Sequence, residues 1–88
     1  MQYKLPTITT LGRGNNCDIQ VPSTLTKVSR EHAQIKIHNS NMYVLYDQSA
    51  GGTLVNGKRE KQVVLRDRDR ISLAGAVEFV FSNGMLSS

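Results

Sequence analysis

Cysteine is scarce in this chain of 88 residues, because Cys17 is the only one. An internal disulfide is therefore impossible, and a reducing, intracellular compartment is the simpler expectation. Long apolar runs are also absent, and no stretch approaches the roughly 20 residues of a membrane-spanning helix. The first residues lack the apolar core of a signal peptide. These absences predict a domain of the cell interior, without a membrane partner.

Helical periodicity is nearly absent as well, since no window repeats apolar side chains at the spacing of an amphipathic helix. Apolar and polar residues alternate instead in Ala33 to His38 and in Val77 to Phe81, as in half-buried strands. Met42 to Asp47 is apolar or aromatic on both faces, which predicts a central strand. Lys58 to Val64 is expected to return as a strand after Asn56-Gly57, a pair that predicts a tight type I′ hairpin.

These short strands, separated by turn residues, predict an all-β sandwich or barrel, and their number favours two packed antiparallel sheets. The length allows one small domain over residues 1–88. Strand-like runs place the core at about residues 5–82. Residues 83–88 are expected to form a tail, and the chain is expected to be a module of a longer protein.

The charge is mildly basic, because 11 Lys and Arg residues face 7 Asp and Glu residues, a net charge of +4. Such an excess favours anionic partners through long-range attraction. It does not by itself indicate a nucleic-acid binder, since no face or helix can be seen to collect the charge.

Metal binding and catalysis are not predicted. The two histidines and Cys17 do not match the spacing of a zinc site, which takes four ligands, and no cofactor motif is present. Ser29 and His32 lie close together in the sequence, but no acid is placed to orient the imidazole. The Gly12-Arg13-Gly14 turn lacks the third glycine and the following helix of a dinucleotide site. The chain is therefore not expected to be an enzyme.

Three polar turns remain as candidates for a binding site. The first contains Gly12 and Arg13, the second is Ser29-Arg30-Glu31-His32-Ala33 at the start of a strand, and the third is Ala50-Gly51-Gly52-Thr53. A hydroxyl and guanidinium groups are donors suited to an anionic oxygen. Taken alone, the first turn is equally an ordinary turn with an exposed arginine, so the prediction depends on whether the three turns meet.

In this order and spacing, the three turns and the following Asn56-Gly57 resemble the forkhead-associated (FHA) domain, from about Leu5 to Phe81. The resemblance implies an eleven-stranded antiparallel β-sandwich whose loops at one end bind phosphothreonine peptides. It also implies that Arg13 and Ser29 contact the phosphate.

The same resemblance assigns further residues to the binding end. Arg30 is placed to touch the phosphate or the peptide backbone, and Ala50 and Gly51 stand at peptide-facing positions. Four residues are implied to hold the loops in shape rather than to contact the ligand or act in catalysis: Gly12, His32, Thr53 and Asn56.

Two of the peptide-facing positions depart from the family pattern. Gly51 stands where the family usually has an Asn that grips the peptide main chain, and Ala50 stands where a hydroxyl often helps to bind the phosphate. Arg68 also replaces a Gly that usually precedes Asp69. The phosphate-facing half of the site is thus retained, while the peptide-gripping half is depleted. Gly51→Asn is expected to tighten binding unless the φ angle at this position strains an Asn.

These observations predict a phosphothreonine-peptide-binding signalling module that acts downstream of a Ser/Thr kinase. The alternative is a phospho-independent scaffold of the same fold, but members of that kind tend to lose the Arg and the Ser, which this chain keeps. A nucleic-acid binder that uses the charge of +4 is the third and least favoured hypothesis.

Overall fold

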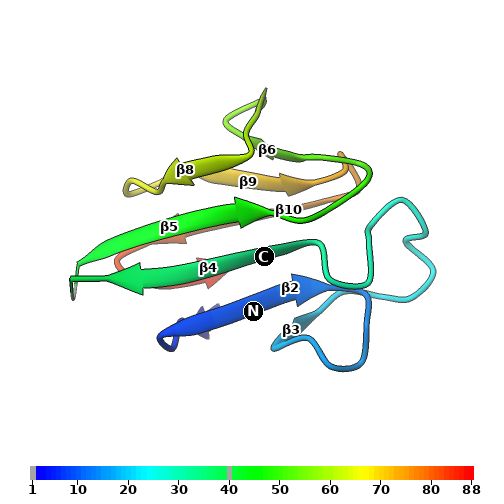
Figure 1. Ribbon diagram of the computed structural model, residues 1–88, viewed down its shortest axis with the longest axis horizontal. Helices are drawn as coiled ribbons and strands as arrows, with labels where there is room; N and C mark the ends of the chain where they lie inside the picture. The colour runs from blue at the N-terminus through cyan, green and yellow to red at the C-terminus, as the bar shows by residue number, and fades with distance from the viewer. Residues whose placement is uncertain (1, 40) are drawn as a thin grey trace.

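A computed structural model describes residues 2–39 and 41–88 and shows two β-sheets packed face to face (Figure 1). The first sheet contains, in spatial order, β1 (Gln2–Lys4), β11 (Met85–Ser87), β10 (Val77–Ser82), β9 (Arg70–Leu73), β6 (Thr53–Val55) and β7 (Lys58–Arg59). The second contains β3 (Ile19–Gln20), β2 (Ile8–Gly12), β4 (Ala33–His38), β5 (Met42–Asp47) and β8 (Gln62–Val64). The predicted β-sandwich of eleven strands is confirmed over the described residues. That part of the chain contains no helix long and apolar enough to cross a membrane.

The second sheet is mixed rather than purely antiparallel. β2 and β3 run parallel, with Leu11 opposite Ile19 and Gly12 opposite Gln20. Only the last two residues of β2 take part in this pairing. The short connection of residues 13–18 is therefore long enough to bring the chain back parallel to β2. This pairing holds the loop that carries Arg13 beside the end of the sheet.

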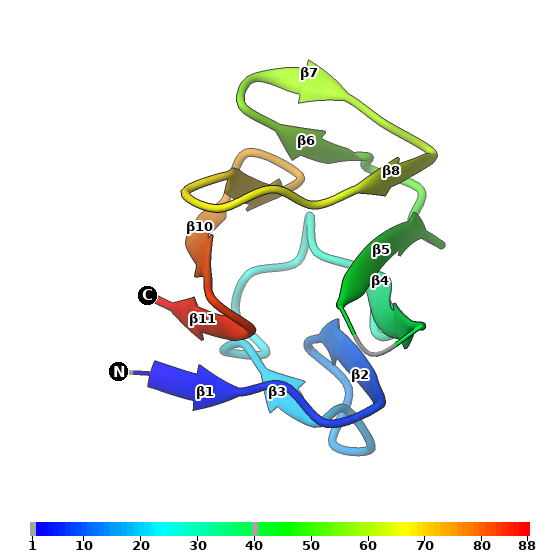
Figure 2. The ribbon, with the colours of Figure 1, turned by 90° about the vertical axis from the view of Figure 1, so that its left-hand side faces the viewer.

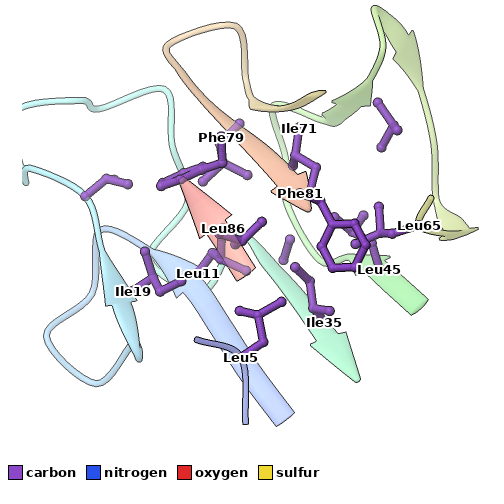
Figure 3. Close-up of a cluster of buried hydrophobic side chains, with 14 of the residues drawn as sticks. Leu5, Leu11, Ile19, Ile35, Leu45, Leu65, Ile71, Phe79, Phe81 and Leu86 are labelled. Carbon is purple, nitrogen blue, oxygen red and sulfur yellow. The ribbon is translucent and has the colours of Figure 1, made fainter. Parts of the chain in front are cut away.

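The core lies between the two sheets, where alternate side chains of facing strands meet (Figure 3). The ring of Phe81 on β10 packs against that of Tyr43 on β5, with ring centroids 5.0 Å apart. Close packing of these core side chains makes the sandwich a rigid frame for its loops. The apolar side chains of this core include those of Leu5, Leu11, Ile19, Ile35, Leu45, Leu65, Ile71, Phe79, Phe81 and Leu86.

Two local predictions are confirmed. β5 is an interior strand between β4 and β8, as its two apolar faces indicated. Asn56 and Gly57 have φ angles of 53° and 83° and join β6 to β7, as a type I′ turn requires. The segment from Lys58 to Val64 is not one strand, however, because β7 belongs to the first sheet and β8 to the second.

The expected tail at residues 83–88 is wrong, because Met85–Ser87 forms β11 between β10 and β1 (Figure 2). The chain reverses at Asn83 and Gly84, whose φ angles are 48° and 75°. Leu86 then lies in the core and is 0% exposed. A strand of three residues with one core side chain shows no periodicity, so only its pairing with β10 and with the distant β1 reveals it.

We expect Leu86→Ala to lower the free energy of unfolding by about 2–5 kcal/mol, the usual cost of emptying a buried leucine site. Met85→Ala is the matched control, since the neighbouring Met85 is only half-buried. Urea denaturation followed by circular dichroism measures both. Equal and small effects for the two variants would contradict the placement of Leu86 in the core.

Candidate functional site

The three loops that carry the predicted site residues meet at one end of the sandwich, on the right of Figure 1. We refer to residues 13–18 as the first loop, residues 21–32 as the second and residues 48–52 as the third. Backbone hydrogen bonds join them: Arg13 N–H to the Ser29 carbonyl at 3.2 Å, Gly14 N–H to the Arg30 carbonyl at 3.0 Å, and Gln48 N–H to the His32 carbonyl at 2.9 Å. The loops therefore form one connected surface.

Gly12 allows the first two loops to touch. A Cβ at this position would overlap the Arg30 carbonyl oxygen and would lie 2.9 Å from the carbonyl oxygen of Ser29. The requirement for glycine thus comes from the close approach of the second loop. Any larger residue would push Ser29 and Arg30 away from Arg13.

Arg13 is anchored by its own side chain. Its Nε donates a hydrogen bond to the carbonyl of Val28 in the second loop. The other guanidinium N–H groups make no hydrogen bond within the described residues, so they remain available as donors. Arg13 and Arg30 line the same surface hollow of about 320 Å³. Two guanidinium groups around one hollow favour an anionic ligand.

Ser29 links the second loop to the third. Its Oγ accepts a hydrogen bond from the Ala50 N–H at 3.2 Å, and its backbone N–H donates to His32 Nδ1 at 3.0 Å. A hydroxyl carries one donor besides its acceptor positions. The hydroxyl hydrogen of Ser29 can therefore still be donated to a ligand oxygen.

His32 braces the second loop against the third. Its side chain is completely buried, and its Nε2 lies 2.8 Å from the Gly52 carbonyl oxygen. Because Nδ1 accepts the Ser29 N–H, the ring proton is on Nε2, which donates to Gly52. The same carbonyl also accepts the Ala74 N–H at 2.9 Å. The imidazole is thus committed to two structural hydrogen bonds.

Asp47 organises the third loop, a role that the sequence analysis missed. Its Oδ1 accepts hydrogen bonds from Ser49 Oγ at 2.6 Å, Ser49 N–H at 3.1 Å and Thr53 Oγ1 at 2.9 Å. Ser49 Oγ in turn accepts the Gly52 N–H at 2.7 Å. The available signal was the Asp-x-Ser pattern, because an Asp side chain commonly bonds the backbone two residues on. Thr53, one of the predicted supporting residues, is buried in this network.

The Asp47 carboxylate is stabilised in its ionised form. Burial acts to raise its pKa, but hydrogen bonds from Ser49, Thr53 and Lys61 act in the opposite direction, so the pKa of Asp47 lies below its ordinary value. Its side chain is 0% exposed, and Lys61 Nζ lies 3.5 Å from Oδ2. The charge therefore holds the third loop in place near neutral pH.

Gly51 is constrained by contact rather than by its φ angle. A Cβ there would lie 2.9 Å from the carbonyl oxygen of Lys27 and 3.0 Å from the Cβ of Ala74. A side chain at Gly51 therefore needs the second loop to move. The expected gain in affinity from Gly51→Asn is opposed by this displacement, a cost that the sequence did not indicate.

Asn56 is not brought to the three loops. Its Nδ2 donates to Asp69 Oδ1 at 2.8 Å, and its Oδ1 accepts the Arg70 N–H at 3.0 Å. These bonds hold the β6–β7 hairpin against the turn before β9, so any support of the site is indirect. Among the described residues, no group of three or more His, Cys, Asp or Glu side chains could hold a metal ion.

Comparison with known proteins shows several similarities over this fold. The FHA domain family model matches residues 9–74. The ABC transporter ATP-binding/permease protein Rv1747 of Mycobacterium tuberculosis is 34% identical over 77 residues, which cover 88% of this chain and 9% of that protein. The chain thus spans less than a tenth of the length of that relative.

Solved structures are also similar over most of the chain, and two of them illustrate the likeness. One comes from a structural and functional analysis of phosphothreonine-dependent FHA domain interactions, with 30% identity and a TM-score of 0.80 over 98% of this chain and 83% of the other. The other is Mycobacterium tuberculosis EmbR in complex with a low affinity phosphopeptide, with 34% identity and a TM-score of 0.77 over 89% of this chain and 20% of the other.

We expect His32→Ala and Ser29→Ala to differ in stability. His32→Ala leaves the Ser29 N–H without its partner and should lower the free energy of unfolding by about 1–3 kcal/mol, with the lost packing adding to this. Ser29→Ala removes only an exposed hydrogen bond and should cost less than about 1.5 kcal/mol. Thermal and urea denaturation compare the variants, and equal losses would contradict the brace formed by His32.

We also expect stability to depend on Asp47 in acid. The folded pKa lies below the unfolded value of about 3.9, so the stabilisation is complete above the unfolded value and is lost as pH falls through the folded one. Between about pH 6 and pH 3, the free energy of unfolding should therefore fall less steeply in Asp47→Asn than in the wild type. Asp67→Asn, at a carboxylate that is 54% exposed, is the matched control. Parallel profiles for the wild type and Asp47→Asn would contradict this role.

Proposed function

The chain belongs to the forkhead-associated (FHA) domain family, and we propose that it is a non-enzymatic module that binds phosphothreonine peptides at the three meeting loops. One observation carries the proposal: Arg13, anchored through Nε, and Arg30 line one hollow, and the neighbouring Ser29 keeps a hydroxyl hydrogen to donate. The phosphothreonine-dependent interactions and the phosphopeptide complex named for the two similar structures support the same ligand class.

The chemistry of the hollow matches a phosphate group. A phosphothreonine carries about −1.5 to −2 charges and three strong acceptor oxygens. The free N–H groups of Arg13 can form charge-assisted hydrogen bonds with these oxygens, each contributing about 1.5–3 kcal/mol. Ser29 adds a neutral donor without bulk, and Arg30 adds a second cation. No bond is made or broken in this function, since the site offers only charge and donors.

Gly51 and Ala50 determine how the rest of the peptide is held. Neither residue offers a side-chain donor or acceptor to a peptide main chain. We infer that recognition is dominated by the phosphate, and that flanking residues of the peptide contribute less than in members that carry the Asn.

This function implies a cellular setting. A Ser/Thr kinase must act upstream to make the phosphothreonine, and the domain works inside the cell where that kinase acts. The alternative is a phospho-independent scaffold of the same fold, which would leave the free donors of Arg13 and Ser29 unused. A nucleic acid is not the proposed ligand, because Arg13, Arg30 and the neighbouring Ser29 form one local group of donors rather than a basic stripe that could follow a nucleic-acid backbone.

We expect Arg13→Ala to weaken phosphothreonine-peptide binding by about 2–5 kcal/mol, the scale for removing one partner of a hydrogen-bonded charge pair. Arg70→Ala is the matched control, because Arg70 is an exposed arginine of β9, away from the three loops, and its N–H and carbonyl pair with Asn56. Calorimetry measures both variants with the phosphorylated peptide.

The same titrations distinguish the competing functions. The wild-type domain should bind the phosphorylated peptide and neither its unphosphorylated twin nor a short oligonucleotide. Equal binding of both peptides would favour the scaffold, and tighter binding of the oligonucleotide would favour a nucleic-acid binder. Unchanged affinity in a folded Arg13→Ala variant would remove Arg13 from the site.

A further inference from the structure

β8 is an edge strand of the second sheet, and its outer side has no neighbouring strand in the described structure. On its inner side, the Lys61 carbonyl and the Leu65 N–H bond to β5 at 2.9 Å and 2.8 Å. Residues of an antiparallel pair alternate between bonding the partner strand and facing away from it. Gln62 and Val64 therefore direct their N–H and C=O groups outward, where an added strand can bond them.

An apolar hollow of about 340 Å³ lies on the outer face of the sheet beside this edge. Its lining includes Met42, Val44, Tyr46 and Val64. Met42 and Val64 are 42% and 49% exposed and both line this hollow, so apolar surface there is open to solvent. This hollow can take an apolar side chain of a strand added to β8.

A second hollow, of about 730 Å³, lies next to the same strand and faces the β6–β7 hairpin. Val63 and Val64 line both hollows, so β8 forms the ridge between them. Lys58 and Arg66 also line the second hollow, and neither makes an ion pair within the part of the chain that the structure describes. Glu60 and Asp69 line it too, and the Asp69 carboxylate is engaged by Asn56 and the Arg66 N–H. This side of β8 therefore offers two cations without ion pairs, beside its valines and Glu60.

The segment of the chain that contains this edge is basic. Residues 58–70 contain six Lys and Arg against three Asp and Glu, a net charge of +3 out of the total of +4. Two of the three acids are engaged: Asp69 accepts from Asn56 and the Arg66 N–H, and Asp67 accepts from Ser82. The local field therefore favours an acidic partner.

We propose that the open edge of β8 is a second binding site, which takes an extended acidic segment of a partner protein as an added strand. Backbone hydrogen bonds to Gln62 and Val64 hold the segment, as in other cases of strand addition. One side of the added strand places an apolar residue in the hollow of Met42 and Val64, and carboxylates on the other side face Lys58 and Arg66. A second copy of this chain is disfavoured, because it would bring two regions of charge +3 together.

The proposal is tested by nuclear magnetic resonance with the ¹⁵N-labelled chain and an end-blocked peptide of alternating Glu and Val residues. The amide signals of Gln62, Val64 and Met42 should shift on titration, while those of Arg13 and Ser29 should not. A peptide of alternating Lys and Val residues is the matched probe and should bind at least about tenfold more weakly, because it meets like charge.

Two variants locate the site. Val64→Glu should weaken binding of the Glu-Val peptide by about tenfold or more, because it sets a carboxylate against the acidic segment. Ile8→Glu makes the same change at a residue that is 51% exposed on the same face, with β4 and β5 between it and β8, and should leave binding unchanged. Val64→Thr, which keeps the β-branched shape, verifies that the strand tolerates substitution.

Several results would overturn the proposal. One is that the amide signals of β8 do not shift with millimolar peptide. Another is that the Glu-Val and Lys-Val peptides bind equally well. A third is that Val64→Glu and Ile8→Glu have equal effects in folded variants. Shifts confined to Arg13 and Ser29 would assign the peptide to the phosphate hollow instead. Wild-type dimers in analytical ultracentrifugation that Val64→Glu dissociates would give the edge to a second copy.

Discussion

The imidazole of His32 is the contact on which the binding end depends. It is completely buried between the Ser29 N–H and the Gly52 carbonyl, so water cannot replace either hydrogen bond. Through these bonds His32, the residue that precedes β4, sets where the hydroxyl of Ser29 lies relative to the third loop. Asp47 fixes that loop from the other side with three hydrogen bonds to one carboxylate oxygen. The donors of the proposed site are therefore held in place by buried groups behind them.

The two ends of the proposed peptide-binding surface differ in how they are built. Arg13 is preorganised by its bond to the Val28 carbonyl, whereas Gly51 is packed against Lys27 and Ala74 and has no side chain to offer. The open edge of β8 begins close to the third loop, which contains Gly51. Lys61, the residue before β8, bonds both the backbone and the carboxylate of Asp47, the residue before that loop. A partner carrying both a phosphothreonine and an acidic extended segment would bind the two proposed sites with a higher effective concentration than either alone.

Much of the fold could be predicted, because strands with one buried face show their alternation directly in the residues, as in Val77–Ser82. The tight turn at Asn56 and Gly57 was equally visible, since few residue pairs accept positive φ at both positions. β11 could not be found in this way, because it is only three residues long and lies between β10, which directly precedes it, and β1, at the other end of the chain. The break between β7 and β8 was also hidden, since residues 60 and 61 carry no strong turn signal.

For the binding end, the sequence alone determined the chemistry: two arginines and a serine in turns before strands are donors for an anion, whatever the detailed geometry. Only the tertiary structure decided which of the implied residues share one surface. It placed Asn56 against Asp69 and Arg70 instead of the loops. It also set the Lys27 carbonyl against Gly51 and gathered Ser49 and Thr53 around Asp47. The physical reason is that residue type carries charge and hydrogen-bonding capacity, whereas close approach and burial depend on segments that only folding brings together.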